Sequence, residues 1–578
     1  MDESKKGRLR RFQVQVAAWT SIAVLMGAVW ISISPPATTS ASPQCRCFPG
    51  DKCWPDAAEW ASLNNSVDGR LIATVPVAAV CHDGFPGVEY DAEKCAEARA
   101  NWLRPELHYQ TMHSPMAPFF ANMSCDPFTP RDAQCVIGAY VPFAVNAFTS
   151  AHYKTTISFA TKHNIRLVIR NTGHDYMGKS TGAGALALWT HNIKHRKVID
   201  YQSKAYTGKA LRVGAGVQAF EAQNTANAAG LVVVEGRCPT VGFAGGYTQG
   251  GGTSPLGSKF GLAADQVLEW EVVTARGDLL TATPDENADL YWALAGGGGG
   301  TYGVVLSMTV KAHKNFPTAG ATLTFVEPTD KYWDIVQAFL LNTPAVLKEG
   351  GTLYWMVMPG NTFYMPQSYL PDGMATDLEA LLLPTIDALD QAGIEYTFKT
   401  ADYPNFQDVL KTTNAEHDIV EINLGGRIIP SSLFNNNNNN NNNTVASLTG
   451  AIRNIVDNGG LVAGVSMAPS RTPESPNSAH PAWRSSSLFV FLGSPHDRKN
   501  MTANIVMQNV VTEEFMAPLE RITPEGGAYL NEAALNQADF QHAFYGSNYP
   551  KLLSIKKKND PDGIFWGPTA VGRLRLDP

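Results

Sequence analysis

The chain has 578 residues, of which 44% are hydrophobic and 17% charged, so neither a disordered nor a fibrous protein is expected. This length exceeds what one hydrophobic core usually serves, and two or more domains are therefore expected. The formal net charge of -7 and the pI near 6.0 argue against a nucleic-acid partner, because such partners require a basic face.

The first 41 residues have the layout of a targeting segment. Basic residues between Lys5 and Arg11 precede an apolar run from Ala17 to Ile33, and small residues then supply a cleavage site after Ala41. We expect a cleaved signal peptide and a secreted, extracellular protein. The alternative is a retained N-terminal anchor that faces outside, since the apolar run is about the minimum for a membrane span. Only in that case would the membrane be a partner.

Residues 42–130 form a cysteine-rich region in which loops and helices are expected, with few strands. Seven of the eight cysteines precede residue 136, which indicates disulfides in an oxidising compartment but does not give their pairing: Cys45, Cys47, Cys53, Cys81, Cys95, Cys125 and Cys135. The eighth, Cys238, lies far downstream. Three roles are open for it: a buried small side chain, a disulfide partner or a point of ligand attachment. Glycosylation sequons fit a secreted glycoprotein, at Asn64, Asn122, Asn442 and Asn500.

From residue 131 the pattern changes to helices alternating with strands. A helix is expected over 141–163, followed by the strand Arg166–Arg170, and another helix over Ala219–Ala229. Further strands are expected at Ala210–Val217, Leu231–Val234, Trp270–Ala275 and Val304–Val310.

The first chemically informative stretch follows the strand that ends at Arg170. Its sequence, Asn171 to Gly182, is rich in Gly, Ser and Thr and contains His174. Such a loop exposes backbone N–H groups that can cradle a pyrophosphate, and its hydroxyls add further donors. An ordinary polar loop with a structural histidine is the alternative interpretation.

The second stretch, Gly236 to Gly252, has seven glycines in seventeen residues and is followed by Phe260 to Asp265. This many glycines cannot serve core packing, and they leave a surface on which a flat ligand can lie against main chain. The third stretch, Gly296 to Gly303, contains a G-x-G-x-x-G match. A Rossmann fingerprint needs a strand before it and a helix after it, whereas here a helical segment precedes and a strand follows.

A second region extends from about 313 to 525. A β-hairpin is expected over Leu353–Met365, and a helix over Thr376–Ala392 that opens with a Thr376/Glu379 capping box and ends at Gly393. The hairpin aromatics either face the ligand or pack in the core: Tyr354, Trp355, Phe363 and Tyr364. The asparagine run 435–443 is interpreted as a disordered surface insertion.

Taken together, the three stretches resemble the FAD-linked oxidases of the vanillyl-alcohol-oxidase type, in their berberine-bridge-enzyme-like branch. The resemblance covers about residues 131–312 and returns at Tyr545–Leu552 and Asp560–Phe565; the whole chain is less specifically similar to secreted fungal isoamyl-alcohol-oxidase-like proteins. It implies an α+β fold with a two-part FAD-binding domain over 131–312. The α/β substrate domain would span 313–525, with an antiparallel sheet backed by helices, and a berberine-type segment, 526–578, would return to the FAD domain.

The same resemblance implies that His174 bonds the flavin 8α-methyl group and that Cys238 bonds flavin C6. The expected cofactor contacts are Asn171, Thr172, Gly173, His174, Asp175, Ser180, Cys238, Val241, Gly242, Gly245, Gly246, Gln249, Gly250, Gly251, Gly252, Ala264, Asp265, Gly303, Val304, Asn548 and Tyr549. No metal is expected.

The implied function is a secreted FAD-dependent oxidase that takes a hydride from an alcohol, a sugar or a phenolic, with molecular oxygen reduced to hydrogen peroxide. A dehydrogenase or an oxidative cyclase of secondary metabolism shares these motifs, and so does a catalytically silent flavin-binding surface protein. The sequence leaves the small-molecule substrate and the oligomeric state open.

The catalytic base is where this chain departs from the family pattern. Tyr247 stands where many relatives have His, and Tyr529-Leu530-Asn531-Glu532 stands where they often have Tyr-x-Asn-Tyr. In an extended segment, Tyr529 and Asn531 would share one face and Glu532 would lie on the other. We expect Tyr529 to be the base, with its phenol pKa lowered by a nearby cation, and Asn531 to help position the substrate or the phenolate. Glu532 is the alternative base, and a structural role for all three is also open.

Overall fold

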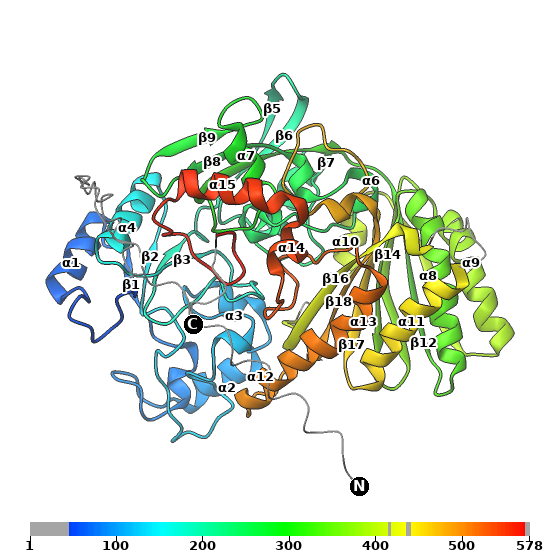
Figure 1. Ribbon diagram of the computed structural model, residues 1–578, viewed down its shortest axis with the longest axis horizontal. Helices are drawn as coiled ribbons and strands as arrows, with labels where there is room; N and C mark the ends of the chain where they lie inside the picture. The colour runs from blue at the N-terminus through cyan, green and yellow to red at the C-terminus, as the bar shows by residue number, and fades with distance from the viewer. Residues whose placement is uncertain (1–44, 414–417, 435–440, 573–578) are drawn as a thin grey trace, which may run out of the picture. The chain divides into compact units, whose positions relative to one another are not determined.

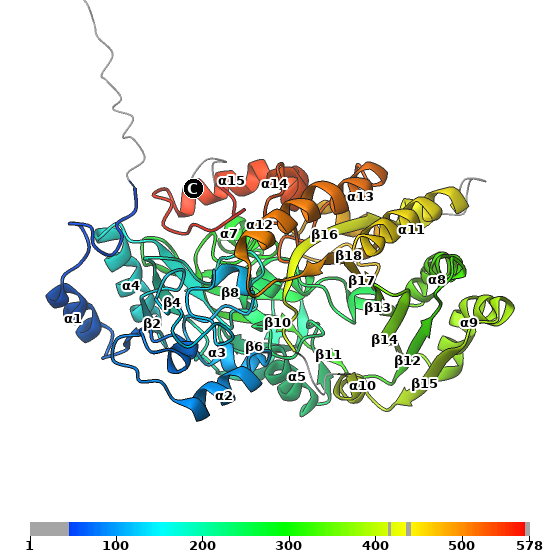
Figure 2. The ribbon, with the colours of Figure 1, turned by 90° about the horizontal axis from the view of Figure 1, so that it is seen from below.

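Three large β-sheets and the helices packed on them make up most of the chain that the computed structural model describes, residues 45–413, 418–434 and 441–572 (Figures 1 and 2). The part from Arg46 onward forms one unit. The mixture of helices with largely antiparallel sheets confirms the α+β fold. The leader lies outside the described residues, among which no helix has the length and apolar character of a membrane span.

The first sheet has the strand order β1-β2-β4-β3, in which β2, β4 and β3 run parallel. Its elements are β1 (Leu71–Ala73), β2 (Phe143–Asn146), α4 (Ser150–Lys162), β3 (Leu167–Arg170) and β4 (Leu186–Trp189). The helix expected over 141–163 is therefore wrong in its first part. The segment before Thr149 pairs with β1 and β4, and the Thr149 side chain caps α4 by accepting a hydrogen bond from the His152 amide at 3.2 Å.

The second sheet is antiparallel, with the order β5-β6-β10-β8-β9. Its elements and their neighbours are β5 (Arg196–Gln202), β6 (Thr207–Gly214), α5 (Ala219–Asn227), β7 (Leu231–Val232), α6 (Gly257–Phe260), β8 (Val267–Val273), β9 (Leu279–Ala282), α7 (Ala288–Leu294), β10 (Val304–Lys311) and β11 (His313–Lys314). The expected strands and the α5 helix are confirmed with shifted ends. Because α7 precedes the glycine run and β10 follows it, a Rossmann fingerprint is excluded there.

The described part of the cysteine-rich region, residues 45–130, contains short helices and a single strand, β1, as the sequence indicates. Its helices are α1 (Ala57–Ser66), α2 (Ala92–Ala100) and α3 (Pro105–Tyr109). Three disulfides close local loops: Cys47–Cys53, Cys81–Cys95 and Cys125–Cys135. Cys45 and Cys238 lie outside these three pairs.

The third sheet has seven antiparallel strands in the order β15-β12-β14-β13-β17-β18-β16, and helices cover one of its faces (Figure 2). The strands are β12 (Thr318–Val326), β13 (Thr352–Met358), β14 (Thr362–Pro371), β15 (Tyr396–Tyr403), β16 (Ile422–Pro430), β17 (Leu461–Ser466) and β18 (Ser486–Pro495). The helices of this region are α8 (Lys331–Lys348), α9 (Ala375–Ala392), α10 (Phe406–Thr413), α11 (Asn441–Asp457), α12 (Met501–Val510) and α13 (Met516–Ile522). The hairpin β13–β14 is confirmed.

Two details of this region differ from the expectation. Helix α9 ends at Gly393 as expected, but it begins at Ala375, and Asp377 accepts the hydrogen bond from the Met374 amide at 2.9 Å. The Glu379 carboxylate accepts from the Thr400 hydroxyl and is not part of a capping box. Of the asparagine run, residues 435–440 lie outside the described residues, and Asn441 begins α11.

The C-terminal segment returns to the first two sheets through α14 (Phe540–Tyr545) and α15 (Tyr549–Asn559) (Figure 1). Phe565 forms a parallel bridge with Leu167 of β3. The buried ammonium of Lys556 donates hydrogen bonds to the Thr301 carbonyl at 2.8 Å and to Asp560. These contacts fix the segment against the glycine run that precedes β10.

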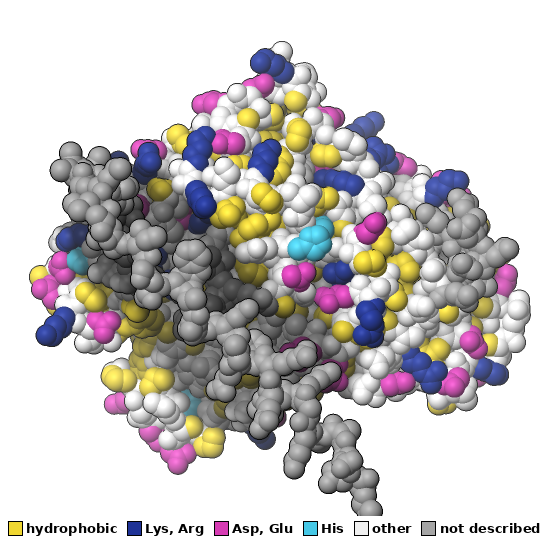
Figure 3. All heavy atoms as spheres, viewed as in Figure 1, with side chains coloured by type: hydrophobic (Ala, Val, Ile, Leu, Met, Phe, Trp, Pro, Cys, Tyr) yellow, Lys and Arg dark blue, Asp and Glu magenta, His cyan; other side chains and the backbone are white. Residues whose placement is uncertain are grey.

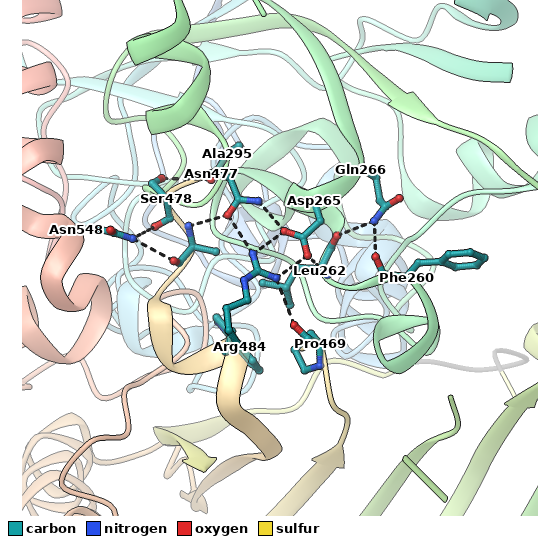
Figure 4. Close-up of polar contacts among 12 residues, drawn as sticks. Phe260, Leu262, Asp265, Gln266, Ala295, Pro469, Asn477, Ser478, Arg484 and Asn548 are labelled. Carbon is teal, nitrogen blue, oxygen red and sulfur yellow. Dashed lines mark hydrogen bonds and ion pairs between the residues drawn. The ribbon is translucent and has the colours of Figure 1, made fainter. Parts of the chain in front are cut away.

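A buried carboxylate joins the glycine-rich segment to the loop between β17 and β18 (Figure 4). Both oxygens of Asp265 accept hydrogen bonds from the Arg484 guanidinium at 2.7 Å, and Asn477 donates to the same carboxylate at 2.6 Å. Asn548 of the C-terminal segment donates to the carbonyls of Ser478 and Ala479 at 3.2 Å. Three distant parts of the chain therefore meet here.

Charged side chains of both signs are interspersed over the face of the molecule in Figure 3. The described residues form no broad basic patch on that face, which agrees with the small negative net charge.

Replacing Asp265 by Ala should destabilise the protein by about 3 kcal/mol, because the Arg484 guanidinium would keep its charge without a carboxylate to balance it. Melting curves of the variant and the wild type measure this. The matched control is Asp330→Ala, which removes an exposed pair with Arg453 of 2.8 Å and should change stability by less than about 0.5 kcal/mol. Equal shifts in the two variants would contradict the role assigned to Asp265.

Candidate active site

A cavity of about 350 Å³ lies among segments that are far apart in the sequence. This volume falls in the range of small-molecule sites. The polar loop after β3, both glycine-rich stretches and the C-terminal segment contribute to its wall. Sixteen predicted site residues line it: Asn171, Thr172, Gly173, His174, Asp175, Ser180, Cys238, Val241, Gly242, Gly245, Gly246, Gln249, Gly303, Tyr529, Asn531 and Glu532.

Asp175 shapes the polar loop. Its carboxylate accepts hydrogen bonds from the amides of Met177 at 2.8 Å, Lys179, and Ser180 at 3.0 Å. These amides are used inside the loop, so only part of the N–H groups that we expected to face a pyrophosphate remain for a ligand. Asp175 therefore acts by holding the loop in shape.

Arg170, the last residue of β3, supports this loop from behind and is fully buried. Its guanidinium donates to the carbonyls of His108 at 3.0 Å and Ser114 at 2.7 Å, which ties the cysteine-rich region to the loop. Gly173 has a φ of +87°, and a Cβ there would lie 2.6 Å from the Arg170 guanidinium. Burial lowers the pKa of Arg170 to about 9. The positive φ and the nearby guanidinium each require glycine at position 173, in the turn before His174.

The two predicted attachment residues, His174 and Cys238, meet at one hydroxyl. His174 Nε2 lies 2.7 Å from Thr240 Oγ1, and Cys238 Sγ lies 3.6 Å from the same oxygen. Burial raises the pKa of the Cys238 thiol, whereas the contact with Thr240 and the charge of Arg237 lower it. Both reactive side chains therefore lie on one part of the cavity wall.

The rest of the wall fits a ligand with several hydrogen-bond donors. Asn171 Oδ1 and Gln249 Oε1 are buried and have no hydrogen-bond partner among the described atoms. A Cβ at Gly246 would meet nothing within 4 Å, so the main chain there faces open space. FAD carries donors on its isoalloxazine, its sugar hydroxyls and its adenine, and it is flat enough to lie on exposed main chain. The residues present therefore fit FAD.

The segment Tyr529–Glu532 forms a turn, in which the Glu532 amide donates to the Tyr529 carbonyl at 2.8 Å. The expectation of an extended segment with Glu532 on the opposite face is wrong, since all three candidate residues line the cavity. Asn531 Nδ2 donates to the Tyr529 hydroxyl and to the Gly246 carbonyl, each at 2.9 Å. The turn is thereby fixed to the glycine-rich segment.

The pKa of the Tyr529 hydroxyl is shifted in the direction opposite to the expected one. Burial and the charge of Glu532 raise the pKa of Tyr529. The groups that lower it are the Asn531 side chain and the main chain of Gly252 and Thr253, none of which is a cation. The prediction that a nearby cation lowers this pKa is wrong.

Glu532 lies among tyrosines. Its charge acts on the hydroxyls of Tyr176, Tyr247, Tyr354 and Tyr529. Burial in these surroundings raises the pKa of Glu532 to about 7. A carboxyl that titrates near neutral pH can take up and release a proton under working conditions, which makes Glu532 the strongest candidate for a general base.

Eight of the predicted cofactor contacts do not line the cavity: Gly250, Gly251, Gly252, Ala264, Asp265, Val304, Asn548 and Tyr549. Asp265 and Asn548 instead join parts of the chain, as described above. A Cβ at Gly250 would lie 2.5 Å from the Asn531 amide group. Gly250 therefore supports the wall from behind by letting Asn531 approach.

The hairpin aromatics mostly serve the core. Trp355 and Phe363 are buried beneath the helices of the seven-stranded sheet, and Tyr364 is 38% exposed. Tyr354 points to the opposite face of the sheet, where the charge of Glu532 reaches its hydroxyl.

Several lining residues escaped the sequence prediction: Pro105, Met116, Tyr176, Lys179, Tyr247, Gly299, Gly300, Asp418, Ile419, Val420, Trp566 and Gly567. Tyr176, Lys179 and Tyr247 stand inside the predicted stretches, and their position there was the available signal. Asp418 to Val420 carry no motif. They are placed by the Ile419 amide, which donates to the Leu103 carbonyl at 2.8 Å.

Comparisons with known families agree with this geometry. Residues 142–283 match the family described as an FAD binding domain. Residues 528–572 match the family described as berberine and berberine like. The first match contains both predicted attachment residues, and the second contains the turn Tyr529–Glu532.

Relatives match over nearly the whole chain. The FAD-linked oxidoreductase sor8 of Hypocrea jecorina is 46% identical, over 96% of each chain. The crystal structure of the VAO-type flavoprotein MtVAO615 from Myceliophthora thermophila is 40% identical with a TM-score of 0.87, over 92% of this chain and 97% of that one. A glucooligosaccharide oxidase from Acremonium strictum, described with a 6-S-cysteinyl, 8α-N1-histidyl FAD, shares the fold at 18% identity and a TM-score of 0.61, over 75% and 92%.

The raised pKa of Glu532 predicts a pH dependence of stability. Both the unfolded and the folded protein hold this proton below pH 4.5, and above it the unfolded chain ionises first. Stability should therefore fall as pH rises from 4.5 to about 7, by roughly 3 kcal/mol from this group. In Glu532→Gln this fall in stability with pH should be absent. The melting temperature of the variant, relative to that of the wild type, should therefore rise between pH 4.5 and pH 8. The exposed Glu513→Gln serves as control, and a difference for Glu532→Gln that is constant with pH would contradict the assignment.

Proposed function

Because the chain belongs to the VAO-type FAD-linked oxidoreductases with a berberine-like C-terminal domain, we propose that it is an oxidase of alcohol-type substrates whose FAD is covalently attached to His174 and Cys238. The observation that carries the proposal is the meeting of these two side chains at Thr240, on the wall of the cavity that Glu532 also lines. The linkage described for the Acremonium strictum oxidase involves the same two residue types.

The residues that would hold FAD are those of the cavity wall. The polar loop, with Thr172, Gly173 and Ser180, would receive the pyrophosphate, and Asn171 and Gln249 would accept hydrogen bonds from the cofactor. A flavin held there would supply the redox chemistry of the proposed oxidase, namely hydride acceptance from the substrate carbon and transfer of two electrons to molecular oxygen, with hydrogen peroxide as the product.

Glu532 would take the hydroxyl proton of the substrate. Its carboxyl titrates near pH 7, so it is ionised often enough to act as a base and is re-protonated in each cycle. The Tyr529 hydroxyl accepts a hydrogen bond from Asn531, which leaves its own proton for donation. Tyr529 would therefore orient the substrate oxygen, and Asn531 would hold Tyr529.

The substrate class follows from a peroxide-coupled screen of primary alcohols, oligosaccharides and phenolics against the purified protein. Peroxide formed in step with one class supports the proposed oxidase. Reduction of the flavin without peroxide would favour a dehydrogenase, and a ring-closed product an oxidative cyclase. No reduction by any class would favour a silent flavin-binding protein.

We further propose that the protein is secreted after removal of its leader at Ala41. The three disulfides of the N-terminal region support an oxidising compartment. Among the sequons, Asn122 and Asn500 are exposed, whereas Asn64 is half-buried. Glycans are thus expected first at Asn122 and Asn500.

N-terminal sequencing of protein from the culture medium should begin near Ser42. Glycosidase treatment should lower the mass, and Asn122→Gln and Asn500→Gln should each remove part of that difference. An intact leader on protein recovered from membranes would favour the N-terminal anchor.

Acid precipitation of the wild type should leave the flavin on the polypeptide. His174→Ala and Cys238→Ser should each retain it through the remaining bond, and the double variant should release it. Absorbance of pellet and supernatant measures the two fractions. Release of all FAD from the wild type would mean that neither bond exists.

Glu532→Gln should slow reduction of the flavin by substrate by about 10²–10⁴-fold, the usual contribution of a positioned base. In the wild type this rate should rise with pH through about 7 as Glu532 ionises, and the rise should be lost in the variant. Anaerobic stopped flow across pH measures both. The comparison is Tyr529→Phe, which should be impaired less; a larger loss there would return the role of base to Tyr529.

A further inference from the structure

The hydroxyl of Thr240 lies between the two side chains that the proposed function assigns to flavin attachment. It is 2.7 Å from His174 Nε2 and 3.6 Å from Cys238 Sγ. Thr240 is 6% exposed, so water has little access to compete for these contacts. A threonine hydroxyl has one proton to donate and two lone pairs to accept with. One hydroxyl can therefore accept from the imidazole and donate to the sulfur at the same time.

The main chain around Thr240 is fixed by the start of helix α5. The Gln218 side chain donates to the Thr240 carbonyl at 2.8 Å. The amides of Ala219 and Phe220 donate to the carbonyls of Val241 and Pro239, each at 2.9 Å. Three hydrogen bonds thus hold the residues on both sides of Thr240, and its hydroxyl has little freedom to leave the position between His174 and Cys238.

We propose that Thr240 is a positioning residue for both flavin attachments, because its hydroxyl sets the His174 tautomer and stabilises the Cys238 thiolate. This inference rests on the proposed covalent attachment. When Nε2 donates its proton to Thr240, the lone pair of the imidazole lies on Nδ1, which is then the nitrogen that would bond the flavin. When Thr240 donates to Cys238, it favours the thiolate, which is the nucleophilic form.

Each attachment is an oxidative bond formation in which Thr240 itself is unchanged. One C–H bond of the flavin and one N–H or S–H bond of the protein are replaced by a C–N or C–S bond. The two electrons and two protons that are released pass to molecular oxygen and form hydrogen peroxide, the acceptor chemistry of the proposed oxidase. Thr240 acts only by holding the attacking atoms in their reactive states.

The test separates the two attachments by combining Thr240→Val with single-attachment backgrounds. Cys238→Ser leaves only the bond to His174, and His174→Ala leaves only the bond to Cys238. In each background, Thr240→Val should lower the rate at which FAD becomes resistant to acid precipitation by about tenfold or more, as expected for loss of a hydrogen bond to a reacting group. FAD bound before precipitation should stay near the level of the parent.

Thr240→Ser keeps the hydroxyl and should restore attachment in both backgrounds. The matched control is Thr156→Val, which removes another buried threonine hydroxyl, bonded to the His152 carbonyl of α4, and should leave attachment unchanged. If Thr240→Val does not fold, Thr240→Ala removes the same hydroxyl without adding volume.

Attachment at the parental rate in both backgrounds would overturn the inference, and a loss in only one background would overturn the shared role. If the parents themselves hold no acid-resistant flavin, the proposed covalent attachment fails instead. The two failures are therefore distinguishable.

Discussion

The buried carboxylate of Asp265 is the interaction on which the shape of the cavity depends. It holds Arg484 through two hydrogen bonds of 2.7 Å, and with it the loop that carries Ser478 and Ala479. The carbonyls of these two residues accept from Asn548, at the start of the helix that anchors the C-terminal segment. The glycine-rich segment, the loop between β17 and β18 and the C-terminal segment therefore keep one relative position. The glycine-rich segment and the C-terminal segment both contribute to the cavity wall.

A second buried charge fixes the same segment from its other end. Lys556 donates to the Thr301 carbonyl and to Asp560, and Asp560 in turn accepts from the Phe565 amide at 2.9 Å. Such charges are stable only because each finds partners inside the protein. The turn at Tyr529, which precedes both anchors in the chain, has no helix or strand of its own, and Asn531 ties it to the Gly246 carbonyl. The position of Glu532 relative to His174 and Cys238 is thus a product of tertiary contacts.

This explains how much the sequence could predict. The polar loop and the glycine-rich stretches were identifiable because their Gly, Ser and Thr residues by themselves indicate main chain that is exposed to a ligand. Most of the residues predicted there line the cavity. The strand β2 was mistaken for helix because its neighbours in the sheet, β1 and β4, are distant in sequence. Asp265 was predicted as a cofactor contact, and nothing near it in the sequence indicates its ion pair with Arg484. The segment at Tyr529 was predicted to be extended because nothing near it in the sequence indicates the contact between Asn531 and Gly246.

The error about Tyr529 has a chemical consequence. A cation beside this phenol would favour phenolate, and it would also keep Glu532 ionised and therefore weakly basic. The structure instead surrounds Glu532 with tyrosines, and burial alone raises its pKa to about 7. Asn531 donates to the Tyr529 oxygen, so the phenol keeps its proton and can only donate it onward. Glu532 is then the group that can accept a proton, and Tyr529 is the neighbour that can donate a hydrogen bond. An alcohol oxygen that is about to lose its proton requires that combination of partners.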